Sequence, residues 1–466
     1  MAHTKEVVSD QVQAERKALL SSEGLPFRSL LSEKKILAAV ERCGVEFRER
    51  IYTPAVTIWA FLSQVMSRGD ASCRDAVSRV VADRVARGKK ACSPDTSSYC
   101  RARCRLPEKA LADLTREIGQ ELHDQARPEW LLKGRPVVIV DGSTSTADDT
   151  PETQKEYPQS RNQKPGLGFP ILRYVVLVSL AVGTILDCAV GACRGKKTGE
   201  QSLFRTIWNA LKAGCILLGD RLFDSYRDVA LLKAREVDSV IGKKQSRRCD
   251  FRRGRRLGKD DHIVVWKKPK YDASRFESEE EWKALPPTME MREIRASIRR
   301  KGYRTRAVVI VTTLLDEKEF TAKELTDLFA ERWNVELDLR SLKRSLGMHH
   351  LHCKTPEMVR KELWMHMLAY NLIRVRMAQA AAVHDKLPRS LSFTATKILI
   401  HNFAPHLKTT CGAEHLRIEM ELLQAIARCR IIKRPGRKEP RAVKKRADTF
   451  PKLTKPRAQA RKGLPA

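Results

Sequence analysis

Two aspartates follow short apolar runs, a position from which carboxylates can hold metal ions. Asp141 comes directly after the run VVIV at 137–140, and Asp220 ends the run CILLGD at 215–220. Because neither run leaves room for a charge inside a sheet, we expect both carboxylates to project from the carboxyl edge of one shared sheet. Either aspartate alone would also suit a turn or a helix N-cap. Together the two predict a paired metal site.

A third acid, Glu336, lies in a helical pattern at 328–343. At ~3.6 residues per turn, residues three, four and seven apart share a face. One face carries Phe329, Arg332, Glu336, Arg340 and Lys343. Another face, suited to packing on a sheet, carries Val335, Leu339 and Leu342. The alternative is an amphipathic surface helix with ion pairs between its turns. A carboxylate flanked by cations instead suits a metal ligand whose neighbours bind phosphates.

The charge balance favours a polyanionic partner. The chain has 89 Lys and Arg against 56 Asp and Glu, a net charge of +33. Acidic membranes would be attracted by the same positive charge, so the distribution of basic residues along the chain says more about the partner. The stretch 243–259 holds nine basic residues and only Asp250 as an acid, between predicted strands, which favours a surface that follows DNA. The basic tail from Lys433 onward has few apolar residues, and we expect it to be largely disordered.

Other classes of protein fit the sequence less well. No run reaches the ~20 apolar residues of a membrane helix, and the start MAHTKEVVSDQ lacks an apolar signal core. The twelve cysteines include no CxxC pair, so a disulfide framework is not expected. Cys92, Cys100 and Cys104 could be imagined as zinc ligands, but no fourth ligand lies at a usual spacing. We therefore expect a cytoplasmic protein with reduced thiols and no membrane partner.

The periodicity of apolar residues divides the chain into α and α/β regions. Helices are predicted at 32–43, 53–65, 106–122, 199–211, 225–235 and 356–382, with another from 321 through the Glu336 segment. Strands are predicted at 137–140, 172–181, 184–192, 215–218, 237–241 and 306–315. Short alternating pieces at 262–266 and 291–298 look like a β-rich insertion rather than part of the main sheet. The expected regions are 1–130, 131–242, 243–303, 304–382, 383–430 and 431–466.

The acidic motifs, in this order, resemble those of a DDE-type transposase of bacterial insertion sequences. The chain is similar to the branch marked by the signature Tyr-x2-Arg-x3-Glu-x6-Lys, and Arg332, Glu336 and Lys343 match its spacing. DGS at 141–143 resembles the first acidic motif, and GDR at 219–221 the second.

Two further segments are family-like. They are Gly199-Glu200 leading into Ser202-Leu203-Phe204, and Leu363-Trp364 with LAYNL at 368–372. Phe329 departs from the family, because it stands where the signature has Tyr. A hydroxyl contact to phosphate is thereby lost or made elsewhere.

The resemblance implies an α/β fold with a ribonuclease-H-like catalytic core. Its mixed sheet is flanked by helices, a β-rich insertion of 243–303 precedes the last catalytic helix, and the all-α module of 1–130 recognises DNA ends. Asp141, Asp220 and Glu336 would be the catalytic residues and would bind two divalent ions, Mg²⁺ with Mn²⁺ as a possible substitute. The expected DNA-binding residues are Phe329, Arg332, Trp333, Arg340, Lys343, Arg221, Lys243 and Lys244.

The function implied by the resemblance is cut-and-paste transposition. The partners would be double-stranded DNA, namely the terminal inverted repeats and the target, and a second copy of the chain on the DNA ends. In this branch a hairpin intermediate with a flipped base is usual. Trp333 is then a conceivable stacking platform, although packing is the common role of such a residue. A nucleoid-associated bacterial enzyme is expected. The alternatives are an inactive DNA-binding remnant and a purely hydrolytic nuclease of the same fold.

Overall fold

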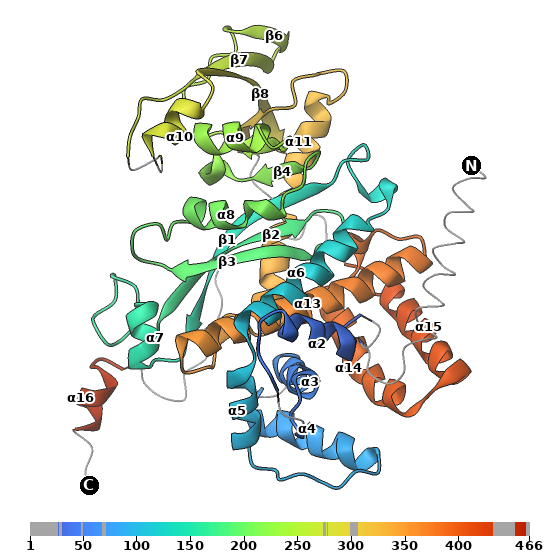
Figure 1. The fold of residues 1–466 in the computed structure, drawn as a ribbon. Coiled ribbons are helices and arrows are strands. Elements are labelled where there is room, and N and C mark those ends of the chain that lie inside the picture. Colours follow the sequence, from blue (N-terminus) through green and yellow to red (C-terminus); the bar gives the residue numbers. More distant parts are fainter. Residues whose placement is uncertain are drawn as a thin grey trace. The chain divides into compact units, whose positions relative to one another are not determined.

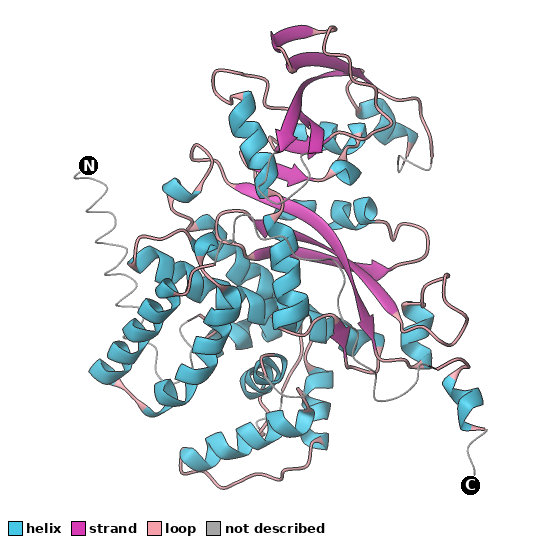
Figure 2. Cartoon of the chain, turned by 180° about the vertical axis from the view of Figure 1, so that it is seen from behind, coloured by secondary structure: helices cyan, strands magenta, loops and turns pink. Residues whose placement is uncertain are grey.

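A computed structural model describes residues 27, 30–47, 50–67, 71–273, 276, 278–298, 306–431 and 453–462 (Figures 1 and 2). The chain forms two compact units. The first unit draws on Met1–Leu131, Ala181–Asp187 and Leu337–Ile431, and the second on Leu132–Leu180, Cys188–Glu336 and Ile432–Ala466. Each unit is therefore assembled from segments that are far apart in the sequence.

A mixed sheet dominates the second unit; its strands are magenta in Figure 2. Among the described residues, nine strands follow one another in the order β3-β2-β1-β4-β5-β9-β8-β7-β6. They are β1 (Val137–Ala147), β2 (Ile171–Ser179), β3 (Ile185–Ala192), β4 (Ile216–Gly219), β5 (Asp238–Gly242), β6 (Arg255–Gly258), β7 (Asp261–Lys267), β8 (Thr288–Ile298) and β9 (Arg306–Thr312). β1 pairs antiparallel with β2 and parallel with β4, and β4 pairs parallel with β5. The predicted strands are confirmed.

The central strands are buried on both faces, as their apolar runs predicted. The first four residues of β1 and all of β4 are buried. Helices α8 (Glu200–Ile207) and α9 (Tyr226–Lys233) pack on β2 and β5 and help to cover the sheet. The Phe204 ring of α8 meets the Phe223 ring edge to face at 5.5 Å. Central parallel strands need such cover, because their side chains leave the sheet on both sides.

The strands between residues 243 and 303 belong to the main sheet. β9 pairs with β5 on one side and with β8 on the other, and β7 and β6 follow β8. The expectation that these strands stand apart from the main sheet is therefore wrong. The physical reason is that the second edge of β9 offers unpaired N–H and C=O groups, which β8 satisfies from Arg292↔Thr312 to Ile298↔Arg306.

The first unit is helical. Its helices are α2 (Glu33–Glu41), α3 (Pro54–Val65), α4 (Cys73–Ala86), α5 (Ser97–Arg105), α6 (Glu108–Asp124), α13 (Pro356–Val383), α14 (Phe393–Thr409) and α15 (Gly412–Arg428). The N-caps of α2, α3 and α4 are Ser32, Thr53 and Ser72, whose side-chain oxygens each accept a backbone N–H bond. The predicted helices of the N-terminal module are confirmed. Helices α4 and α5 are additional, and their many charged residues obscure the apolar period.

The long helix α13 forms the core of the first unit. It packs against α3, α6, α14 and α15, and most of its 28 residues are buried. The Asn371 amide donates to the carbonyl oxygens of Thr115 at 2.9 Å and Ile185 at 2.8 Å, which ties α13 to α6 and to the segment 181–187. Although α13 is long, neither it nor any other helix in the described part of the chain is apolar enough to cross a lipid bilayer.

The remaining elements are short. They are α7 (Pro151–Glu156), α10 (Glu279–Ala284), α11 (Ala322–Glu331), α12 (Asn334–Arg340), β10 (His350–Leu351) and α16 (Arg457–Arg461). The predicted disorder of the basic tail falls mainly on residues outside the described ones. Within the tail the described residues are 453–462, which contain α16.

Candidate active site

Asp141 and Asp220 come together at the end of β4. Asp220 follows β4 directly, as predicted. Asp141 does not end its strand, because β1 continues to Ala147 and pairs with β2 through Thr146↔Ile171. That part of the prediction is wrong. The parallel pairing of β1 with β4, however, stops at Ile139↔Leu218, so Asp141 still lies just beyond the carboxyl end of its neighbour.

Glu336 is presented by a helix that is interrupted next to it. The predicted continuous helix is instead α11, which ends at Glu331, and α12, which begins at Asn334, followed by a π-helical turn over Ser341–Ser345. The break is a tight turn in which the Arg332 N–H donates to the Phe329 carbonyl at 3.2 Å. Glu336 lies in the first turn of α12, with its side chain 38 % exposed. The break thus sets the direction of the Glu336 carboxylate independently of α11.

The Asp141 carboxyl lies in the electric field of the other two acids. Burial raises the pKa of Asp141 to about 6, although the Gly142 N–H bond and the charge of Arg332 both lower it. The charges of Asp220 and Glu336 contribute to this rise. A cation bound beside Asp141 would therefore favour the charged form of its carboxyl, against the effect of burial.

The donor set of this site suits a hard divalent cation. All three acids offer carboxylate oxygens, the ligands that Mg²⁺ and Mn²⁺ prefer. Asp141 Oδ1 accepts the Gly142 N–H bond at 2.9 Å, and Asp220 Oδ1 accepts the Leu222 N–H bond at 2.8 Å. The Asp220 bond is the N-cap bond of a short 3₁₀ turn. Asp220 can cap this turn with one carboxylate oxygen and bind a metal ion with the other. These bonds hold one oxygen of each aspartate in a fixed orientation.

A fourth acid, Glu200, packs on the face of β1 opposite to the Asp141 side chain, because successive residues of a strand point to opposite faces. A Cβ built on Gly142 would lie 2.4 Å from the Glu200 carboxyl carbon, so this side chain covers the residue that follows Asp141. Burial raises the pKa of Glu200, the charge of Arg173 lowers it and the charge of Asp220 raises it. In the sequence, Glu200 belongs to a family-like segment and has no predicted role. Its contact with Gly142 is a finding of the structure.

Four predicted DNA-binding residues of the second unit are exposed or half-buried. Arg332 pairs with Glu336, with Nη2 3.4 Å from Oε1. Trp333 is 39 % exposed, which is unusual for a tryptophan. Arg221 follows Asp220 and is exposed. Lys244 is half-buried, and its N–H donates to Asp224 at 2.8 Å.

Two other predicted DNA-binding residues are buried. Phe329 is 8 % exposed, and its Cζ lies 3.2 Å from a Cβ built on Gly242, so the ring fills the space above that glycine. The Lys243 ammonium donates to both carboxylate oxygens of Glu293 at 2.7 Å, and the two side chains are 4 % and 3 % exposed. The prediction that Lys243 contacts phosphate is therefore not supported, because a buried lysine already paired with an acid cannot reach DNA without breaking that pair.

The last two predicted DNA-binding residues are Arg340 and Lys343, which belong to the first unit. Arg340 ends α12 and is exposed, and Lys343 lies half-buried in the π-helical turn. Burial and the charge of Arg344 lower the pKa of Lys343. The predicted apolar face is confirmed, because Val335, Leu339 and Leu342 are all buried.

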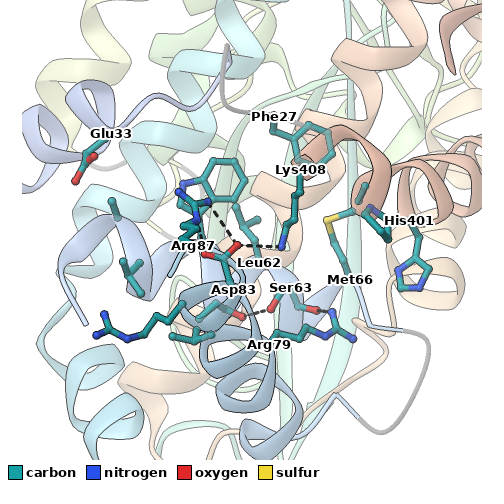
Figure 3. Close-up of a pocket in the computed structure, with 18 of the residues that line it drawn as sticks. Phe27, Glu33, Leu62, Ser63, Met66, Arg79, Asp83, Arg87, His401 and Lys408 are labelled. Carbon is teal, nitrogen blue, oxygen red and sulfur yellow. Dashed lines mark hydrogen bonds and ion pairs between the residues drawn. The ribbon is translucent and has the colours of Figure 1, made fainter. Parts of the chain in front are cut away.

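A cavity of about 580 Å³ lies in the first unit among α3, α4 and α14 (Figure 3). Its lining is apolar with charged residues at the rim. There Asp83 pairs with Arg87 at 3.0 Å and with Lys408 at 3.6 Å, and Arg79 donates to the Ser63 carbonyl at 3.0 Å. None of the three acids of the active site lines it. The cavity is therefore a feature of the first unit and distinct from the carboxylate site.

Comparisons with known proteins identify the family of the chain. A family model described as "Transposase DDE domain" matches residues 132–372, more than half of the chain and a range that contains all three acids. Transposase InsG for insertion sequence element IS4, from Escherichia coli strain K12, is 28 % identical over 374 residues, which cover 77 % of this chain and 78 % of InsG. Putative transposase InsL for insertion sequence element IS186A, from the same strain, is 34 % identical over 65 residues, 14 % of this chain and 18 % of InsL.

A solved structure of piggyBac transposase in a synaptic complex with hairpin DNA aligns with 89 % of this chain and 86 % of its own, with 10 % identity and a TM-score of 0.43. The family assignment rests on the match to the family model and on the carboxylates that this match contains. The chain belongs to the transposase DDE domain family and is an enzyme that cleaves and transfers DNA strands.

Proposed function

We propose that Asp141, Asp220 and Glu336 hold two divalent ions, Mg²⁺ or Mn²⁺, at the edge of a ribonuclease-H-like sheet. The observation that carries the proposal is the partly buried Asp141, whose carboxyl lies in the field of the other two acids and of Arg332. Such a group of acids gains most from cations of high charge and small size. The all-oxygen donor set favours Mg²⁺ and Mn²⁺ over softer metals.

The neighbouring side chains indicate which role each group has at this site. When bound, the ions activate a water or a 3′-hydroxyl and stabilise the departing oxygen. Arg332 pairs with Glu336 and can exchange that carboxylate for a phosphate, since a guanidinium binds both in the same geometry. The exposed part of Trp333 offers a surface for an unstacked base.

The proposed substrates are the terminal inverted repeats of the chain's own insertion sequence, which are cut and joined to target DNA. InsG, which is similar over most of this chain, is the transposase of such an element. The net charge of +33 supports a DNA partner, and the helical module within residues 1–130 would recognise the ends. A homodimer on the paired DNA ends completes the proposal. The inactive-remnant alternative is less favoured, because all three acids are present.

Substitutions on the Glu336 segment should separate binding from chemistry. If Arg332 and Lys343 face phosphates, changing either to Ala should weaken binding to any DNA sequence about equally. The salt slope of the affinity should fall by roughly one unit in each case. Glu336→Gln should lose cleavage while its salt slope stays unchanged or becomes slightly steeper, because a negative charge beside the DNA is gone. Binding would be measured at several salt concentrations, together with the rate of end cleavage.

Lys323→Ala is the matched control, since Lys323 is an exposed lysine of the neighbouring α11. It should leave both the salt slope and the cleavage rate as they are. If the three polar residues only pair with one another on a solvated helix, each variant would cost ~0.3–0.5 kcal/mol of stability and leave DNA binding intact. That result would contradict the phosphate-contact proposal.

A further inference from the structure

A second cluster of potential metal ligands lies on strands β7 and β8 of the second unit. It consists of Cys249, His262 and Glu293, whose sulfur, ring nitrogen and carboxylate oxygen all lie within 4.8 Å of one another. His262 of β7 and Glu293 of β8 are paired in the sheet register, so their side chains share one face. Both are buried, and Cys249 is half-buried. The cluster contains none of the three acids of the active site.

The His262 ring is oriented as a metal ligand would be. Its Nδ1 lies 2.7 Å from the Arg253 carbonyl oxygen. Because a carbonyl oxygen can only accept, Nδ1 carries the proton of a neutral ring, and Nε2 then offers a lone pair. That Nε2 faces Glu293 Oε2, another acceptor, at 3.3 Å. Either a second ring proton or a metal ion between the two atoms satisfies both of them. A backbone carbonyl on the far nitrogen is a common partner of a metal-bound histidine.

The separations within the cluster suit a small tetrahedral ion. Nitrogen and oxygen ligands of zinc, each about 2.0–2.2 Å from the metal, lie roughly 3.3–3.6 Å apart in a tetrahedron. The distance between His262 Nε2 and Glu293 Oε2 is 3.3 Å. The Cys249 sulfur lies 3.0 Å from the same oxygen. It would have to move outward by about half an ångström to reach the zinc–sulfur geometry. Cys249 lies in a loop, where such a shift disturbs no helix or strand.

Lys243 is the group that competes with a metal ion for Glu293. Its Nζ donates to both carboxylate oxygens at 2.7 Å and to the Arg248 carbonyl at 2.9 Å. The alternative to a metal site is that Glu293 serves only to neutralise this buried ammonium. That role requires neither Cys249 nor His262, yet both place a ligand atom on Oε2. A metal ion on Oε2 leaves Oε1 to Lys243, so the two cations can share the carboxylate.

We propose that Cys249, His262 and Glu293 bind a zinc ion, which fastens the basic segment 243–259 to the sheet. A thiolate together with an imidazole favours Zn²⁺ over the hard ions proposed for the three acids. On binding, the Cys249 thiol releases its proton to solvent, and a water molecule takes the fourth position of the tetrahedron. The ion would hold in place a loop whose arginines point into solvent, such as Arg252, with a side chain 89 % exposed.

The experiment titrates the full-length protein, without DNA, with Co²⁺, which replaces Zn²⁺ and absorbs strongly when a thiolate is bound to it. The thiolate-to-cobalt band should appear in the wild type and disappear when Zn²⁺ is added. Cys249→Ser should abolish the band, and His262→Gln should weaken Co²⁺ binding at least about tenfold. The carboxylate site offers no sulfur, so Asp220→Asn should leave the band unchanged. The result is therefore independent of the three-acid proposal and of activity.

Cys193→Ser is the matched control, because Cys193 is another half-buried cysteine of the second unit. It should keep the band at wild-type intensity. Amide exchange over 244–254 should slow when Zn²⁺ is added to the wild type and to Cys193→Ser, but not to Cys249→Ser. The absence of a band in the wild type, a band undiminished in Cys249→Ser, or wild-type affinity in His262→Gln would overturn the zinc site. Should His262→Gln fail to fold, Cys249→Ser and the exchange measurement decide.

Discussion

Replacing Asp141 or Asp220 by Asn, or Glu336 by Gln, is expected to reduce the rate of DNA end cleavage by at least about 1000-fold. Each change removes one metal ligand from a site in which the ions supply several kcal/mol of transition-state stabilisation. Binding to the DNA ends should remain nearly intact, because most of the affinity comes from phosphate contacts made by other residues. Cleavage of labelled end DNA in Mg²⁺ and a binding titration on the same variants provide the measurement.

A suitable control is Asp327→Asn, an exposed acid on α11 that makes the same chemical change outside the carboxylate site. It should cleave at the wild-type rate. Persistent cleavage in any one of the three active-site variants, with Mg²⁺ supplied, would remove that residue from the metal site. Loss of DNA binding together with cleavage would instead point to a structural role for the acid.

The second large effect concerns Asp338, whose replacement by Ala should lower the free energy of unfolding of the first unit by about 3–5 kcal/mol. Its side chain is 1 % exposed and accepts bonds from two arginines. Arg389 Nη1 donates to both carboxylate oxygens at 2.7 Å, and Arg374 of α13 donates to Oδ1. Removing the acid leaves the buried Arg374 without its counter-charge. Chemical denaturation, followed by a probe in the first unit, measures the loss.

Asp338 lies in α12, and its bonds to the two arginines anchor this part of the helix within the first unit. Asp327→Ala is the control, and as a surface change it should stay within about 0.5 kcal/mol of wild type. A loss below about 1 kcal/mol for Asp338→Ala would mean that the arginines find other partners and that the pair does not anchor α12.

Local pattern was enough to predict most of the elements that build the site. The apolar runs before Asp141 and Asp220 are buried strands, as predicted, and Val335, Leu339 and Leu342 form the buried face of the Glu336 segment. These features depend on short-range periodicity, which a single sequence contains. The family-like spacing then related the three acids to one another, although they are far apart in the chain.

The features that could not be predicted depend on contacts between residues that are far apart in the sequence. β1 extends past Asp141 only because β2 supplies hydrogen bonds as far as Ile171. Lys243 belongs to a basic stretch that reads as a DNA-binding surface, yet Glu293, fifty residues later, buries its ammonium. The break between α11 and α12 is hidden because the helical period continues across it. Glu200 acquires its position from Gly142, and no spacing rule links the two.

The most direct test of the central claim is a strand-transfer assay with the wild-type protein. Full-length protein, Mg²⁺ and linear DNA bearing the element's terminal repeats would be incubated with a supercoiled target plasmid, and the product junctions sequenced. If Asp141, Asp220 and Glu336 drive both cutting and joining, the 3′-ends of the element should be covalently joined to the target, and no junctions should form with Asp220→Asn. Ends that are only hydrolysed, or junctions that persist in Asp220→Asn, would contradict the account.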